Sequence, residues 1–159
     1  MNISSLRQIG AAVAVTVALA ATVNASAPAG RYTYTATSVT VVDTKTGLTW
    51  QRAFAAPMSW VNAKVYCASA STSTTLGSPG WRVPTMKELQ SLVDYSRTST
   101  PAIDQTAFPA TPPNYFWSSS LGLGGASYNA LVVLFYDGSS GGLDSTANSG
   151  EVANVRCVR

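Results

Sequence analysis

The side chains best suited to binding a small polar ligand lie late in the chain, in stretches rich in glycine and serine. A tyrosine ring offers a flat face for a sugar ring, and asparagine and aspartate offer hydrogen-bond partners for hydroxyl groups. Loops on a rigid scaffold often carry such residues. A competing interpretation is that these residues only cap turns and meet solvent. The candidate ligand-binding residues are Tyr128, Asn129, Asp137, Asp144 and Asn148.

Metal binding and catalysis have weaker support. The carboxylates of Asp137, Asp144 and Glu151 could gather around a hard cation such as Ca²⁺, but their spacing matches no EF-hand loop, so we predict no metal site. The chain has no histidine, which excludes Ser-His-Asp and Cys-His centres and every His-ligated metal. We therefore predict a protein that is not an enzyme, with no catalytic residue and no cofactor.

The composition favours a secreted protein rich in β-strands. Charged residues make up only 11% of the chain. The net charge of +3 is too small to indicate a surface that binds nucleic acid. Residues 1–25 have the pattern of a signal peptide, with Arg7 before an alanine- and valine-rich run and small residues at the cleavage position. The alternative is a membrane anchor, but the run is shorter than the ~20 residues that span a bilayer.

The domain prediction follows from that signal. Residues 26–30 form a short linker and residues 31–159 one domain. We expect a mature protein that is secreted, periplasmic or at the cell surface, with no membrane span after cleavage.

The two cysteines are best explained as one disulfide, because a secreted chain with two cysteines most simply pairs them. The bond would join Cys67, in a predicted helix, to Cys157, in the last predicted strand. A reactive thiol pair is the alternative. It lacks an activating histidine, and the only nearby cation is Lys64, three residues from Cys67.

The first half of the chain predicts strands followed by a helix. Alternation over residues 31–37, continued to residue 42, indicates a strand, and a turn at 43–47 leads into a second strand at 48–52. Ser59 can cap a helix from Trp60 to about Ala70. The Ser/Thr run at 69–75 is predicted to be a flexible loop.

The clearest local signal lies at residues 80–95. Pro84 favours extended backbone before it, and Thr85 with Glu88 three residues later forms a capping-box pattern. Arg82 is expected to pair with Glu88 or Asp94. The apolar face of the predicted helix comprises Met86, Leu89, Leu92 and Val93.

The second half predicts a long loop at 96–113, pinned to the core by Ile103 and Phe108, and then strands. Strands are expected at 115–119, 131–136 and 152–159, with turns at 122–125 and 137–142. Strands, two helices and further strands indicate an α+β fold. The tryptophans are expected in the core rather than on a ligand platform; they are Trp50, Trp60, Trp81 and Trp117.

Several stretches together resemble a known family. They are residues 42–50, 60–67, 81–85, 87–89, 92–94, 101–104, 107–109, 116–119 and 155–159. In this order they are similar to the Lcl C-terminal-like domain, a family named after a bacterial collagen-like adhesin. The resemblance implies a C-type-lectin-like fold: a small twisted antiparallel sheet, two helices, long loops, paired first and last strands, and a disulfide that Cys67 and Cys157 match. The sequence lacks the triplets of calcium-dependent lectins.

These observations predict a secreted or surface-exposed, non-catalytic binding module. Its expected ligand is carbohydrate, with sulfated polysaccharide implied by the resemblance, or another extracellular ligand. The alternatives are a protein-binding or structural component of a surface assembly, in which the domain could form a homo-oligomer, and an oxidase similar to formylglycine-generating enzymes. The oxidase would need an accessible, redox-active cysteine pair.

Overall fold

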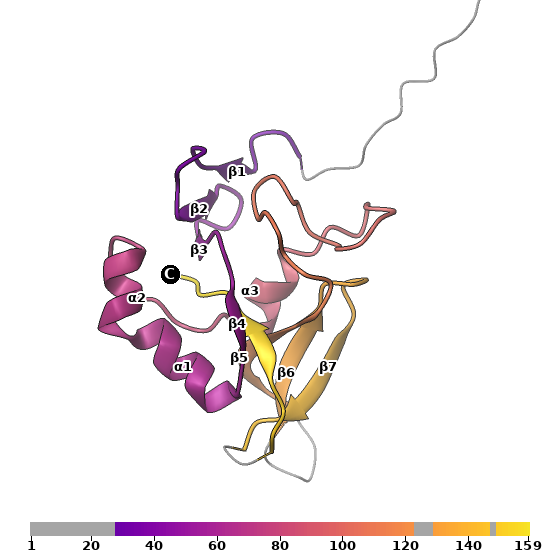
Figure 1. Ribbon diagram of the computed structural model, residues 1–159. Coiled ribbons are helices and arrows are strands. Elements are labelled where there is room, and N and C mark those ends of the chain that lie inside the picture. The colour runs from indigo at the N-terminus through magenta and orange to yellow at the C-terminus, as the bar shows by residue number, and fades with distance from the viewer. Residues whose placement is uncertain (1–27, 123–128, 147–148) are drawn as a thin grey trace, which may run out of the picture.

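The protein has an α+β fold with two sheets (Figure 1). The computed structural model describes residues 28–122, 129–146 and 149–159, so the predicted signal peptide lies outside the described residues. In the described part, no helix has the length and apolar character needed to cross a bilayer. The elements are β1 (Tyr32–Thr33), β2 (Thr40–Asp43), β3 (Thr49–Gln51), β4 (Ala55–Met58), α1 (Trp60–Ala68), α2 (Ala70–Thr75), α3 (Met86–Gln90), β5 (Tyr115–Leu121), β6 (Asn129–Leu134), β7 (Ser140–Asp144) and β8 (Ala153–Val155).

The last strand lies inside the larger sheet. The small sheet has the order β1-β2-β3, and the larger one has the order β4-β8-β5-β6-β7. β8 pairs antiparallel with β4 and through a single parallel pair with β5. The first described strand, β1, pairs with β2, so the expected pairing of first and last strands is not formed by β1 and β8. The end of the described chain nevertheless meets the small sheet, because Val158 forms an antiparallel bridge to Trp50 in β3.

The larger sheet is buried on both faces. Successive strand residues point to opposite faces, and Phe116 and Trp117 accordingly belong to two separate core clusters. One cluster includes α3 residues, the other α1 residues, and Figure 1 shows α1 and α2 on the side of the molecule away from β7. The predicted core position is confirmed for Trp50, Trp81 and Trp117, whereas Trp60 is only partly buried.

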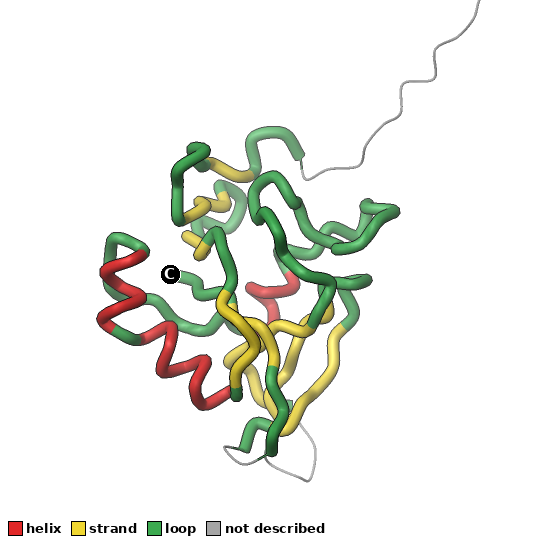
Figure 2. The backbone as a smooth tube through the Cα atoms, viewed as in Figure 1, coloured by secondary structure: helices red, strands yellow, loops and turns green. Residues whose placement is uncertain are grey.

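The connection from α3 to β5 contains no helix or strand (Figure 2). Its residues Ile103 and Phe108 are fully buried, as predicted from their apolar character. Ile103 also forms a bridge to Val93. The long loop is therefore anchored in the core by these residues, while other parts of it are exposed.

The Ser/Thr run forms a helix, so the prediction of a flexible loop at 69–75 is wrong. Ser69 ends α1 and also caps α2, because its hydroxyl accepts a hydrogen bond from the Thr72 amide at 3.1 Å. The Thr72 hydroxyl donates to the Tyr66 carbonyl at 2.6 Å, and Thr74 donates to the Ala70 carbonyl at 3.0 Å. Hydroxyl groups that satisfy nearby backbone groups explain why a run with low helix propensity is helical here. The described residues therefore form three helices, where the sequence predicted two.

The strands also differ from the sequence prediction. The expected strand at 31–37 is reduced to β1, because a turn follows it in which the Ser38 amide donates to the Thr35 carbonyl. Residues 140–142, predicted as part of a turn, belong to β7, whose register with β6 is continuous. β4 was not predicted, since it contains Pro57, which disfavours central strands; β4 lies at the edge of its sheet.

The capping box is confirmed. The Thr85 hydroxyl accepts from the Glu88 amide, and Glu88 Oε2 accepts from the Thr85 amide at 2.7 Å. Arg82 also donates two hydrogen bonds to Glu88, at 2.8 and 2.7 Å, so Glu88 and not Asp94 is its partner. Arg82 and the Thr85 amide together hold the pKa of Glu88 at about 2. One carboxylate thus fixes both the start of α3 and the extended segment before it.

The predicted disulfide is present. Cys67 in α1 is bonded to Cys157, 90 residues later, and both are fully buried. The bond joins the first helix to the segment that passes through the centre of the fold, so it limits how far these parts can separate in the unfolded chain.

Replacing both cysteines, as Cys67→Ala with Cys157→Ala, should lower the free energy of unfolding by as much as about 4.6 kcal/mol, the value that chain entropy gives for a loop of this length. Urea denaturation would measure the loss. Reductant should destabilise the native protein and leave the double variant unchanged. Equal urea midpoints for the two proteins would contradict a structural role for the bond.

The pKa of Glu88 predicts an acid-sensitive contribution to stability. Because the folded pKa lies below the ordinary value of about 4.3, the contribution is fully present above pH 4.3 and is lost as the pH falls toward 2. Glu88→Gln should therefore cost about 1 kcal/mol at pH 6 and almost nothing near pH 2. Glu151→Gln is the control, since Glu151 forms no ion pair among the described residues. A stability difference independent of pH would disprove this assignment.

Candidate functional site

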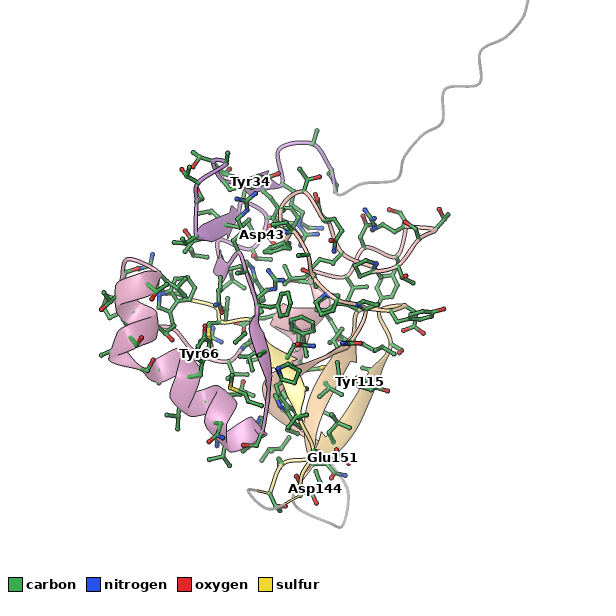
Figure 3. All side chains as sticks on the ribbon, in the orientation of Figure 1. Tyr34, Asp43, Tyr66, Tyr115, Asp144 and Glu151 are labelled. Carbon is green, nitrogen blue, oxygen red and sulfur yellow. A yellow bond between two sulfur atoms is a disulfide. The ribbon has the colours of Figure 1, made fainter. Side chains whose placement is uncertain are left out.

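The structure brings two of the predicted ligand-binding residues together. Asn129, the first residue of β6, is the cross-strand partner of Asp144, the last residue of β7. Glu151 joins them, because its Oε2 accepts a hydrogen bond from the Asp144 amide at 3.1 Å, and Figure 3 shows Asp144 and Glu151 at the same end of the sheet. Tyr128 and Asn148, the other candidates here, lie outside the described residues.

Asp137 lies elsewhere. It follows β6 in the turn that leads to β7, and the four residue steps from Ser140 to Asp144 alone span about 13 Å. The three carboxylates therefore do not gather around one point. Among the described residues, no group of three potential metal ligands of the Cys, Asp or Glu type comes together.

The carboxylates at both ends of the β6–β7 hairpin bind the protein's own amides. Asp137 accepts from the Ser139 amide at 2.9 Å, and the hydrogen bonds from Ser139 lower the pKa of Asp137. Asp144 accepts from the Thr146 amide at 2.8 Å. This geometry supports the turn-capping interpretation for both aspartates. Of the described candidates, only Asn129 is exposed and has a side chain without a hydrogen-bond partner in the described part of the chain.

A groove that the sequence did not reveal lies where four strands meet. It has a volume of about 220 Å³, and Tyr115, labelled in Figure 3, forms one wall. The other walls come from segments far apart in sequence. The lining residues are Pro57 beside β8, Asn114 and Tyr115 at the start of β5, Leu134 at the end of β6, and Val152, Ala153 and Asn154 at β8.

The groove combines an aromatic face, an amide and an apolar base. The Tyr115 side chain is 42% exposed, although its backbone lies in β5. Asn154 is buried and donates from its amide to the Tyr115 carbonyl at 3.2 Å, which fixes the backbone under the ring. Asn114 is exposed, and its side-chain amide has no partner among the described residues, so it can donate to and accept from a ligand.

Two more exposed tyrosines lie at or near the β6–β7 turn. Tyr136 is exposed and lies two residues beyond Leu134, the cross-strand partner of Tyr115. Tyr95 is exposed too, and its hydroxyl donates to the Gly138 carbonyl at 3.2 Å. Only glycine fits at position 138, because a Cβ there would lie 2.3 Å from Val93 and the backbone has a positive φ of 83°.

The comparison with known families supplies the identity of the domain. The family model described as the Lcl C-terminal domain matches residues 39–159. The chain belongs to the Lcl C-terminal domain family. The matched range begins just before β2 and includes both half-cystines and every residue that lines the Tyr115 groove. A search among curated proteins finds no significant match.

The sequence carried a partial signal for this groove. Asn114 and Tyr115 form a polar and aromatic start to a predicted strand, which could have marked them as accessible. Val152 and Pro57 could not have been found in this way, because only the three-dimensional arrangement of β4 and β8 brings them to β5.

In this Lcl C-terminal domain, Tyr115→Ala should change the free energy of unfolding by only about 0.5 kcal/mol, because Tyr115 lies at the surface and is 42% exposed. Asn154→Ala should cost about 1–3 kcal/mol, since it removes a buried side chain and leaves the Tyr115 carbonyl without its side-chain donor. Thermal and urea denaturation would measure both. If Tyr115→Ala were as costly as Asn154→Ala, the ring would be a structural residue and not an accessible wall.

Proposed function

We propose that this protein is a secreted or surface-exposed, non-catalytic binding module that recognises carbohydrate in the Tyr115 groove. The observation that carries the proposal is the exposed Tyr115 ring beside the free amide of Asn114. An aromatic face packs against the apolar face of a sugar ring, and an amide donates to one hydroxyl and accepts from another. The volume of about 220 Å³ is below the range of about 300–1,000 Å³ that is typical of drug-sized ligands. It suits one or two residues of a longer glycan.

The disulfide supports an extracellular location. Disulfides persist in oxidising compartments and are rare in the cytosol. The buried Cys67–Cys157 bond also argues against the oxidase alternative, which needs an accessible thiol pair, because both cysteines are fully buried. The pattern of residues 1–25 and the bond thus favour the same compartment.

A protein partner is the second candidate, and one surface favours it. Val61 and Val65 lie one turn apart on the outer face of α1, and they are 36% and 65% exposed. Exposed apolar side chains on one helix face are typical of contact surfaces. This surface would serve the alternative role, in which the domain binds a protein partner or forms a homo-oligomer within a surface assembly.

The test is binding of the secreted protein, residues 26–159, to a glycan array that includes sulfated polysaccharides. Tyr115→Ala should weaken binding at least tenfold, about 1.4 kcal/mol, because it removes the aromatic wall. Tyr136→Ala is the matched control, since Tyr136 is also an exposed tyrosine but does not line the groove. It should leave the affinity unchanged.

The outcomes separate the alternatives. Binding that is lost equally in both tyrosine variants would move the site to the wider aromatic surface. Binding that survives Tyr115→Ala but falls steeply with salt would indicate polyanion recognition by lysine and arginine instead. If no glycan binds and Val65→Glu abolishes self-association or capture of a partner, the α1 surface and a protein-binding role would replace the proposal.

A further inference from the structure

A second cavity, larger than the Tyr115 groove, lies away from it and has a different chemistry. Its volume is about 410 Å³, within the range of small-molecule sites. It is bounded by the segment before β2, the segment after β3, the end of α2, and the loop at 109–110. Its apolar walls are formed by Val39, Leu76, Pro109 and Ala110.

Arg52 supplies a positive charge at this cavity. Its guanidinium connects two loops that each contribute residues to the lining: it donates to the Ala36 carbonyl at 3.0 Å and to the Ala107 carbonyl at 3.3 Å. Its remaining hydrogen bonds to carbonyls are 3.3–3.4 Å long. These distances are longer than those of strong N–H···O hydrogen bonds. No carboxylate of the described residues forms an ion pair with it.

A second uncompensated arginine lies behind the same wall. Arg156 is fully buried and donates to the carbonyls of Gln51 and Arg52, at 3.0 and 2.6 Å, and both of these residues line the cavity. Burial lowers the pKa of Arg156 to about 9, which leaves it cationic at neutral pH. Its Nε has no hydrogen-bond partner in the described part of the structure, and no described carboxylate forms an ion pair with it.

Two cations facing only neutral partners make the cavity electropositive. A ligand anion would exchange the long, neutral hydrogen bonds of Arg52 for charge-assisted ones, which are shorter and about twice as strong. Partial burial of Arg52 reduces the screening of that interaction by water. The apolar walls, in turn, exclude a ligand that is charged or polar throughout, such as a polysaccharide chain.

The wall also holds a conformationally unusual residue. Ala110 has a φ of +57°, in the left-handed region that a residue with a side chain seldom adopts. Glycine would adopt it readily. Alanine therefore adds a methyl group to the loop that forms this wall, where it contributes apolar surface.

We propose that this cavity binds a small amphipathic organic anion, with its carboxylate at Arg52 and its apolar body against Val39, Leu76, Pro109 and Ala110. The site is separate from the Tyr115 groove, because no residue lines both.

The test uses the disulfide-bonded secreted protein with benzoate as the probe and benzyl alcohol as its neutral counterpart. Heteronuclear NMR titration should show shifts at Val39, Leu76 and Ala110, with benzoate binding at least tenfold tighter than benzyl alcohol. Hexanoate and hexanol, as a second pair, separate the need for a carboxylate from a preference for an aromatic body.

Two variants locate the site. Val39→Trp should fill the cavity and weaken benzoate binding at least tenfold, because Val39 is 49% exposed and lines it. Val42→Trp is the matched control: Val42 also lies at β2 and is 40% exposed, but it does not line the cavity. It should leave binding unchanged. Arg52→Gln should remove the preference for carboxylate over alcohol.

Three results would overturn the proposal: no binding of either carboxylate at 10 mM, equal affinity for acid and alcohol, or full binding by Val39→Trp. If Arg52→Gln does not fold, because it loses several backbone contacts, the two ligand pairs and the tryptophan variants still decide the question.

Discussion

The closing segment of the chain, residues 153–158, is the constraint on which the rest of the structure depends. All six residues are buried. Its first half inserts between β4 and β5 as β8, and its second half reaches the disulfide partner in α1 and the bridges to Trp50 and Arg82. This one segment thus joins the larger sheet, the small sheet through Trp50, and α1 through the disulfide.

Arg156 shows how that segment is held in the interior. A buried guanidinium normally needs a carboxylate, because removing a charge from water is costly. Here carbonyl groups of Gln51 and Arg52, the Thr111 hydroxyl and the face of the Phe108 ring surround it, the last at 4.5 Å. Carbonyl dipoles and an aromatic face stabilise a cation without supplying a negative charge. The arrangement ties three distant segments together and leaves a net positive charge inside the fold.

Local signals in the sequence were sufficient for elements that depend on local chemistry. The capping box at Thr85 and the helix start at Ser59 rest on side chains that bond amides two or three residues away, so their pattern could be recognised directly. The disulfide followed from counting cysteines. The α2 helix was missed because its hydroxyl groups bond back to their own backbone, which composition alone does not distinguish from a loop. The glycines of β7 led to the prediction of a turn, because glycine is common in turns. Pairing with β6 instead keeps them in a strand.

The candidate sites were less predictable for a related reason. Conspicuous residues such as Asp137 and Asp144 turned out to bond their own loops, whereas the Tyr115 groove is built from four strands whose adjacency no local pattern encodes. The same central strand that makes the groove also makes it rigid, because β8 is fixed by the buried disulfide and by Asn154. A preformed site loses little conformational freedom on binding. A small domain with short strands can therefore hold an accessible tyrosine on a fixed backbone, and this preorganisation would favour the glycan recognition that we propose.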